Sequence, residues 1–520
     1  DNLPLVHIAP SGKDTADCGP AGNPCLTPPF AMDRVTTGGT LEIADGHYQT
    51  VDWHITKSLS IMGAGAENSI LDAEGKGRVL FIAEGAAVLI QGLTIRGGKV
   101  EGIGNEDVGG GGILNTGHLT LRGVVIEDNQ VIAGNGASGS NGSAAAALSG
   151  RAAKGRNVRC NLNNKQLKDC NFSPVVGRTG KTGTAGGAGV SGTKGGNAFG
   201  GGIYNAGNLL ITDVIARRNH AAGGNGGNGG HGGNGGKGQA GGHSGIGSGT
   251  LKILFVDTEW CGPWHGGRGG TGGNGGNGGD GGAGGTAFGG AVYSAENARL
   301  NVINSRFQLN RADAGSPGTL GRGASGGSPG ANGNPGVAKE GCPWPPNWTV
   351  PRQPTRYNGR NGTNGSAGAI GLAAGGAVYL EGRVSPTSIH GSILAGNTAE
   401  VGAGIAQFGE KPLTVVHSTF AGNNSSVIGS SVAGTGSFQL SNSISASPGA
   451  PSKKKSFKSL AAAHPKLKNV RQIGSSGLAW DGNLSEGSGG NCLAGWPEEA
   501  ENPASMPVSY THLTLPTNGT

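Results

Sequence analysis

Two short segments of the chain gather aromatic, basic and imidazole side chains of the kinds that bind sugars or protein surfaces. Indole and phenol rings stack on flat apolar faces, while guanidinium and imidazole groups beside them supply hydrogen bonds. We therefore predict a ligand-binding surface made of Trp260, Trp264, His265, Trp344, Trp348, Arg356 and Tyr357. The alternative is that these rings pack on one another as a small core that locks the ends of the segments together.

The seven cysteines indicate disulfide bonds rather than a metal site. No C-x-x-C or Cys/His ligand spacing occurs, so we expect no metal or other cofactor and an oxidising compartment outside the cytoplasm. Cys492 has no obvious partner. We predict three bridges, two closing short loops and one joining the aromatic segments: Cys18–Cys25, Cys160–Cys170 and Cys261–Cys342.

Carboxylates that could perform acid–base catalysis are scattered along the sequence. Hydrolysis of a glycosidic bond by paired carboxylates needs two of them facing one substrate. The adjacent pairs near the repeated segments described below are Glu106 with Asp107 and Glu127 with Asp128. We interpret each pair as a solvated turn, and we therefore assign no catalytic residue.

Long glycine-rich tracts with a strict period of three separate these segments. Glycine makes up 110 of the 520 residues, and it recurs at every third position from Gly223 to Gly241 and from Gly266 to Gly284. This period fits neither an α-helix nor a β-strand, but it fits the threefold polyproline-II-type helix. The alternative is a set of flexible, disordered loops, which would have no reason to keep the register.

A shorter repeat flanks the glycine tracts and ends in asparagine. Small residues, an aliphatic residue and an alternating apolar stretch precede Asn129, Asn219, Asn310, Asn397 and Asn423. The last two are 26 residues apart, whereas the earlier gaps are 90, 91 and 87 residues. We infer a coil of about 26 residues that receives three insertions of 64, 65 and 61 residues at the same point. This period predicts a parallel β-helix in which the asparagines form a turn ladder.

The repeat also carries a family resemblance. The GGA(I/V)…F-x-x-N pattern at Gly289–Asn310, and its ending at Phe420–Asn423, resemble the repeats of polymorphic outer-membrane proteins. More broadly, the chain resembles the pectin-lyase-like right-handed β-helix proteins of bacterial surfaces. The resemblance implies an all-β solenoid, secretion or display at the cell surface, and often adhesion.

The three insertions are expected to lie together. Each runs out, turns at a tip and runs back, and insertions from consecutive coils must leave side by side. We predict a lateral bundle of about six polyglycine-II-type helices, because a single such helix has no internal hydrogen bonds. The expected organisation is an N-terminal cap and first coils (1–132), insert 1 (133–198), a coil (199–220), insert 2 (221–287), a coil (288–312), insert 3 (313–374), C-terminal coils (375–500) and a non-native or disordered tail (501–520).

The net charge of +7 is concentrated in a few segments. Residues 133–198 hold nine Lys or Arg and one acid, and residues 452–471 hold seven Lys or Arg and no acid. Solvated basic loops explain this pattern, and attraction to an acidic surface polysaccharide is the alternative. We expect no nucleic-acid partner, because no recognised binding fold accompanies the basic residues, and no membrane span, because no apolar run reaches about 18 residues.

Together these features predict a secreted or surface-displayed structural or adhesin-like protein, non-catalytic, that binds a glycan or protein partner through the tips of its insertions. One alternative is a carbohydrate-active β-helix enzyme, a polysaccharide lyase or hydrolase. A convergence of three or more carboxylates within about 5–9 Å on one face of the β-helix would distinguish this enzyme from the adhesin-like protein. Another alternative is an ice-binding or fibre-forming extracellular protein that associates with itself.

Overall fold

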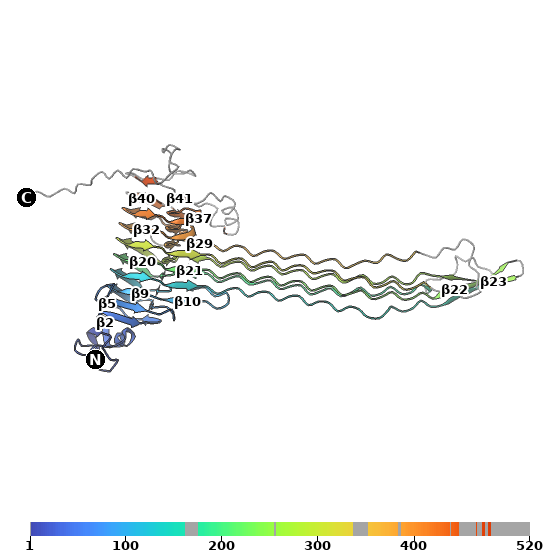
Figure 1. Ribbon diagram of the computed structural model, residues 1–520, viewed down its shortest axis with the longest axis horizontal. Coiled ribbons are helices and arrows are strands. Elements are labelled where there is room, and N and C mark those ends of the chain that lie inside the picture. Colours follow the sequence, from blue (N-terminus) through green and yellow to red (C-terminus); the bar gives the residue numbers. More distant parts are fainter. Residues whose placement is uncertain are drawn as a thin grey trace, which may run out of the picture.

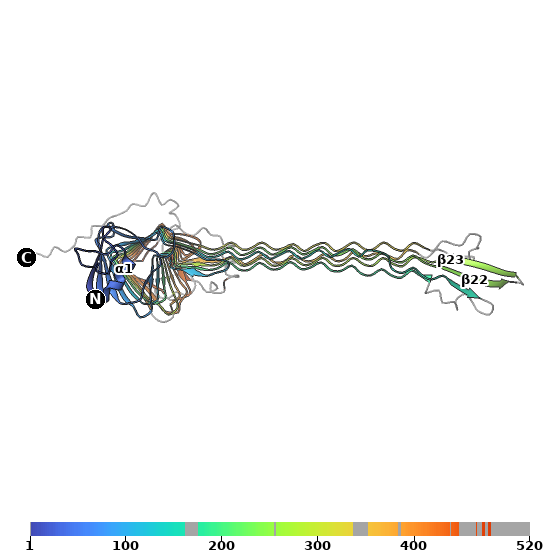
Figure 2. The same cartoon turned by 90° about the horizontal axis from the view of Figure 1, so that it is seen from below.

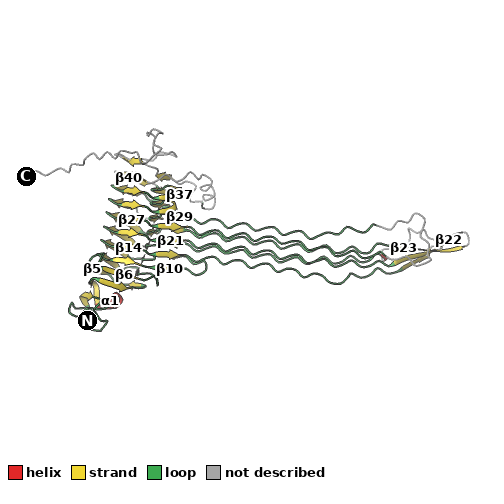
Figure 3. Cartoon of the chain, in the orientation of Figure 1, coloured by secondary structure: helices red, strands yellow, loops and turns green. Residues whose placement is uncertain are grey.

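The molecule consists of a column of stacked coils and a long arm that leaves the column sideways (Figure 1). The structure is a computed structural model, and it describes residues 2–161, 175–253, 256–335, 352–382, 386–436, 438–441, 443–446, 464, 471–473 and 477–479. Strands make up the column, and the arm is drawn as extended chain between the column and a small sheet at the far end (Figure 3). The predicted parallel β-helix is confirmed.

Three sheets form the walls of the column, and nearly all neighbouring strands in them are parallel. The first wall contains β1 (Leu3–Ile8), β2 (Val35–Ile43), β5 (Leu59–Gly63), β8 (Ala87–Gln91), β13 (His118–Arg122), β19 (Asn208–Thr212), β26 (Arg299–Ile303), β31 (Thr387–His390), β35 (Leu413–Val416) and β39 (Phe438–Ser441). The second contains β4 (Trp53–Ile55), β7 (Leu80–Ile82), β12 (Ile113–Asn115), β18 (Ile203–Asn205), β25 (Val292–Ser294), β30 (Val378–Leu380), β34 (Ile405–Gln407), β38 (Val432–Gly434) and β41 (Arg471–Ile473). The third contains β3 (Gly46–Gln49), β6 (Ser69–Asp72), β9 (Thr94–Arg96), β14 (Val125–Glu127), β20 (Ile215–Arg217), β27 (Arg306–Gln308), β32 (Ile393–Ala395), β36 (Thr419–Ala421), β40 (Ser443–Ala446) and β42 (Gly477–Ala479).

A fourth sheet joins the column to the arm. The strands that precede the three outward legs lie in one half of this sheet, and the strands that follow the return legs lie in the other half. The order is β10 (Lys99–Glu101), β15 (Gln130–Ile132), β21 (His220–Ala222), β28 (Arg311–Asp313), β33 (Thr398–Val401), β29 (Ala373–Ala374), β24 (Ala287–Phe288), β17 (Ala198–Phe199) and β11 (Val108–Gly109), with β37 (Asn424–Ile428) paired to β33.

Alternation along each strand decides which side chains enter the column. In β13, Leu119 and Leu121 are buried, whereas the side chains between and after them point outward. Parallel pairing places Leu119 directly between Val88 and Leu209 of the neighbouring coils. Repetition of this register builds one continuous aliphatic core, because each coil covers the apolar face of the next.

The N-terminal end of the column carries the single helix of the described ranges, α1 (Pro28–Arg34). Proline occupies its first turn, where a missing N–H costs no helical hydrogen bond. Ala31 joins the core, and a Cys18–Cys25 disulfide closes the loop that precedes the helix. Within the described ranges no helix has the length and apolarity that crossing a lipid bilayer requires.

The asparagines that end the repeats stack one above another inside the column. In each step the side-chain Nδ2 of one residue donates to the Oδ1 of the next, at 3.0, 3.0, 3.0 and 2.9 Å. Each buried amide also satisfies backbone groups of neighbouring coils, such as the Ile126 carbonyl that accepts from Asn219 at 2.9 Å. This asparagine ladder consists of five fully buried residues, Asn129, Asn219, Asn310, Asn397 and Asn423. It therefore fixes the turn that follows the third wall in each of these coils.

The arm is a hydrogen-bonded bundle of six legs in two rows. The outward legs (133–157, 223–245 and 314–335) form one row and the return legs (175–197, 264–286 and 352–372) form the other, and the views in Figures 1 and 2 agree on their straight, side-by-side course. Within a row, Gly139 N–H donates to the carbonyl of Asn228 at 2.7 Å, and the same bond recurs every three residues. Between rows, Gly227 N–H donates to the carbonyl of Thr193 at 2.8 Å, again with a period of three.

Glycine density follows the number of neighbours that a leg has. The legs 223–245 and 264–286 each bond to four others, and most of their triplets contain two glycines, whereas most triplets of the legs with fewer neighbours contain one. A Cβ on Gly233 would collide with the backbone carbonyl of Ser143, and one on Gly276 with that of Gly187. The period-three glycines are therefore the positions at which two backbones meet.

A small sheet occupies the far end of the arm. It contains β16 (Val158–Asn161), β22 (Ile246–Ile253) and β23 (Val256–Pro263), one strand from the first insertion and an antiparallel hairpin from the second. This sheet links two insertions at the tip and was not predicted from the sequence.

Candidate functional site

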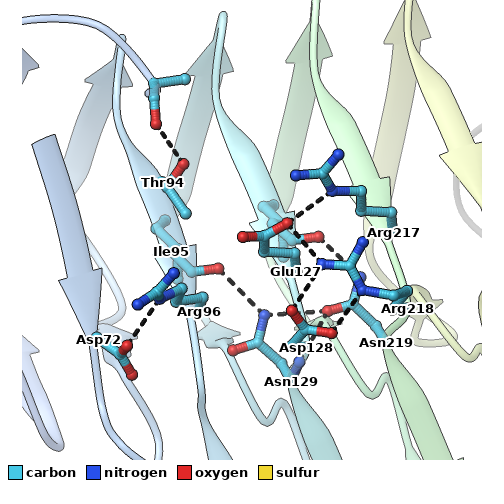
Figure 4. Close-up of polar contacts among 12 residues, drawn as sticks. Asp72, Thr94, Ile95, Arg96, Glu127, Asp128, Asn129, Arg217, Arg218 and Asn219 are labelled. Atoms are coloured by element: carbon cyan, nitrogen blue, oxygen red, sulfur yellow. Dashed lines mark hydrogen bonds and ion pairs between the residues drawn. The ribbon is translucent and has the colours of Figure 1, made fainter. Parts of the chain in front are cut away.

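The outer face of the third wall carries a row of alternating charges, which we call the charged ladder: Asp72, Arg96, Glu127 and Arg217 (Figure 4). They end strands β6, β9, β14 and β20, and the parallel register pairs each with the next. Because equivalent positions of stacked parallel strands project the same way, four residues spread over 146 positions of sequence stand in one line.

The first end of the charged ladder holds an imidazole against a buried carboxylate. Asp72 is 7% exposed, and its Oδ2 lies 2.7 Å from Arg96 Nε and 2.9 Å from His47 Nε2. Burial opposes ionisation of Asp72, but hydrogen bonds from the Glu74 N–H, Arg96 and His47 outweigh it and hold the pKa of Asp72 below its usual value. The His47 side chain is 44% exposed, so an oriented imidazole faces solvent.

The other end of the charged ladder is a network of two carboxylates and two guanidinium groups. Glu127 Oε2 lies 2.6 Å from Arg217 Nε and 3.0 Å from a nitrogen of Arg218, which also lies 2.8 Å from Asp128. The hydrogen bond to Asp128 is the largest of the effects that raise the pKa of Arg218. Asp128 and Arg218 both have a φ of 54°, and this left-handed turn directs the following asparagine inward.

These contacts correct one sequence-based interpretation. Glu127 was expected in a solvated turn, but it is 7% exposed and bound to two arginines that come from the next coil. The reason is the 90-residue separation between Glu127 and Arg217, which corresponds to one step of the column. Glu106 and Asp107 are exposed, as a solvated turn requires.

The protonation of these groups restricts the chemistry of the face. Hydrolysis by two carboxylates needs one that stays protonated to act as an acid. Asp72 is held ionised, and it stands two strand spacings, about 10 Å, from Glu127. The arrangement instead suits proton abstraction, because His47 is oriented by a carboxylate while Arg96 can hold an anionic substrate group beside it.

The residues predicted for ligand binding are only partly brought together. Arg356 and Tyr357 are exposed on the third return leg, and the Arg268 guanidinium lies 5.5 Å from the centre of the Tyr357 ring. Trp264 and His265 are half-buried at the start of the second return leg. The other positions lie outside the described residues or belong to strands whose side chains are not described: Trp260, Trp344, Trp348, Cys160, Cys170, Cys261 and Cys342.

Sequence reasoning missed the charged ladder for an identifiable reason. Glu127 and Arg217 each stand two residues before a ladder asparagine, so the repeat alignment contained a signal for their contact. His47, Asp72 and Arg96 lie in the first coils, where the asparagine-ended repeat that reveals equivalent positions is absent.

Comparisons with known proteins bear on the fold. No family model matches the sequence, and no curated protein matches it. Among solved structures the chain resembles a pectin methylesterase in complex with hexasaccharide VII, with a TM-score of 0.30 and 8% identity over 90% of this chain and 92% of that one. It also resembles the pectin methylesterase PemA from Erwinia chrysanthemi, with a TM-score of 0.27 and 7% identity over 89% and 96% of the two chains. A rhamnogalacturonan lyase matches with a TM-score of 0.25 and 13% identity over 85% of this chain and 75% of that one.

These comparisons correct the expectation of a non-catalytic protein. By their printed names, the solved structures reported above are enzymes, two pectin methylesterases and a rhamnogalacturonan lyase. The expectation had rested on scattered carboxylates, whereas the column brings carboxylate, imidazole and guanidinium groups into one row.

Proposed function

We propose that this chain is a carbohydrate-active enzyme that binds an acidic polysaccharide along the charged ladder and cleaves it by β-elimination. The observation that carries the proposal is the exposed His47 imidazole, which contacts buried Asp72 at 2.9 Å with Arg96 beside both. A base oriented by a carboxylate, next to a fixed cation, is what proton abstraction beside a carboxylate group requires.

The step assigns one role to each side chain. Arg96 binds the uronate carboxylate of the substrate and withdraws charge, which acidifies the proton on the adjacent carbon. His47 Nδ1 takes this proton while its Nε2–H donates to Asp72, which holds the ring and stabilises the imidazolium. The freed electron pair forms a carbon–carbon double bond, and the glycosidic oxygen leaves with a proton from water.

Polysaccharide as the substrate class has two further supports. The charged ladder extends over four consecutive strands of a straight wall, so a long polymer can lie across several coils. The printed names of the resembling structures are those of enzymes of pectin and rhamnogalacturonan, and one of them was solved with a hexasaccharide. The proposal includes an extracellular location, which the Cys18–Cys25 disulfide favours.

The arm belongs to the proposal as a rigid element. We assign its legs to polyglycine-II-type helices, because their N–H groups bond to neighbouring legs at every third residue. Such a bundle would extend the enzyme sideways without mobile linkers.

The test uses the full chain with polygalacturonate. Unsaturated chain ends and new reducing ends are measured in parallel for wild type, His47→Ala and Arg96→Ala, and methanol release is measured with methyl-esterified pectin as a second substrate. We expect unsaturated ends from wild type and a loss of at least about 100-fold in His47→Ala, since a general base contributes on that order. His118→Ala is the matched control, because His118 is exposed on the first wall and away from the charged ladder.

Two results would overturn the proposal. One is the absence of unsaturated ends from wild type on all acidic polysaccharides tried. The other is equal turnover by His47→Ala and His118→Ala.

A further inference from the structure

The arm carries far more positive charge than the rest of the molecule. Its six legs, together with β16 at the end of the first outward leg, contain thirteen Lys or Arg and a single acid, Asp280, which gives +12 against +7 for the whole chain. The remaining residues are therefore net acidic by 5. This contrast separates a basic arm from an acidic column.

The charge gathers in the distal half of the arm. The hydrogen bond that Gly187 N–H donates to Ser143 at 2.8 Å marks the middle of the bundle. Beyond this level, the six legs and β16 hold eleven Lys or Arg and no Asp or Glu: Arg151, Lys154, Arg156, Arg159, Arg178, Lys181, Lys237, Arg268, Arg352, Arg356 and Arg360. All except half-buried Arg268 are exposed. The tip segments 162–174, 246–263 and 336–351 hold four Lys or Arg and four acids, so they leave this excess unchanged.

A hydrogen-bonded frame holds these charges in place. The backbone carbonyls of Lys237, Arg268 and Arg360 each accept an N–H from a neighbouring leg, at 3.1, 2.9 and 2.8 Å. The accepting carbonyls recur every three residues along each leg, so these basic residues stand at equivalent positions of the repeat. Because the backbone is already ordered, binding a polymer there costs little additional chain entropy.

We propose that the distal half of the arm is a second binding site, for an acidic polysaccharide. The choice of polymer rests on the proposed function. The second site would hold the polysaccharide at the far end of the arm, away from the charged ladder where the reaction is proposed to occur. The uncompensated charge attracts an extended polyanion, and binding releases the counterions that accompany the polymer.

The surface favours a polysaccharide over a nucleic acid. Among the described residues of the arm, the basic side chains are accompanied by one exposed large aromatic ring, Tyr357, and the Arg268 guanidinium lies over its face. Stacking platforms for bases are the usual partner of a basic groove that binds single strands. A polymer of uronates carries a carboxylate on each sugar, so it can bind this surface through its charges.

The test compares two double variants that remove one Lys and one Arg each from the full chain. Lys237→Ala/Arg360→Ala alters the distal half, and Lys194→Ala/Arg322→Ala is the matched control in the proximal half. Binding of polygalacturonate is measured against salt concentration. We expect the distal variant to bind about tenfold more weakly and to lower the slope of log affinity against log salt by about 1.4. The proximal variant is expected to change both quantities far less.

Three results bear on the inference. Equal weakening by the distal and proximal variants would contradict it, as would tighter binding of duplex DNA than of polygalacturonate. Retained turnover of short oligosaccharides by the distal variant would support it. His47→Ala is expected to bind the polymer as wild type does, so failure of the catalytic proposal would be seen separately.

Discussion

Replacement of the central ladder asparagine, Asn219→Ala, tests whether the ladder holds the coils together. The side chain takes part in four hydrogen bonds inside the column. It donates to Asn310 at 3.0 Å and to the Ile126 carbonyl at 2.9 Å, and it accepts from the side chain and backbone N–H of Asn129 at 3.0 and 3.2 Å. Alanine removes all four.

The expected cost follows from the burial of these groups. A buried hydrogen bond contributes about 1 kcal/mol net, and a polar group left without its partner costs about 1–3 kcal/mol. We therefore expect Asn219→Ala to lower the free energy of unfolding by about 4 kcal/mol. Asn208→Ala is the matched control on the same coil, because its side chain makes an exposed contact with His118 at 2.7 Å. Its expected cost is at most about 1 kcal/mol.

Urea denaturation followed by circular dichroism measures both variants, and amide hydrogen exchange locates the effect. Exchange in β14 and β20, which precede Asn129 and Asn219, should accelerate in Asn219→Ala. If Asn219→Ala lowered the free energy of unfolding by less than about 1 kcal/mol, no more than the Asn208→Ala control, the reasoning would be refuted.

Three further predictions concern the arm, the charged ladder and the N-terminal loop. Gly233→Ala places a methyl group against a backbone carbonyl of a neighbouring leg, so amide exchange across the bundle should rise, whereas Asn234→Ala, which loses one exposed bond from the Ser325 N–H at 3.3 Å, should raise it far less. The folded-state pKa of Asp72 is lowered, so its stabilisation exists above its ordinary value of 3.8 and is lost as pH falls through the folded value. Wild type should therefore lose more stability than Asp72→Asn on acidification below about pH 4, as denaturation at each pH will measure. Replacing Cys18 and Cys25 by serine should cost about 2.5 kcal/mol of unfolding free energy, since the bridge closes a short loop of the unfolded chain.

The fold could be predicted because its signals are periodic. The spacing between ladder asparagines, once each insertion is subtracted, gives the length of one coil, and alignment of the coils places Leu119 beside Leu209 as the structure does. The glycine register similarly identified the positions where legs approach one another. The pairing of β16 with β22 at the tip had no such signal, because neither strand belongs to a repeat.

The candidate site could not be predicted to the same extent. His47 and Asp72 are 25 residues apart, and Asp72 and Arg96 are 24 apart, in coils whose turns share no common residue. Contact among these three residues depends on the register between neighbouring strands, and composition alone does not determine that register. Glu127 was visible in the sequence, but its pairing with Arg217 follows only when their 90-residue separation, a coil plus its insertion, is counted as one step of the column.

Chemical rescue of His47→Ala tests the central claim most directly. Free imidazole is added to the His47→Ala protein with polygalacturonate, and the formation of unsaturated ends is followed. The account predicts that imidazole restores part of the lost rate, while Arg96→Ala gains nothing from it. Turnover by His47→Ala at the wild-type rate, or no response of a slowed His47→Ala to imidazole, would contradict the assignment of His47 as the base.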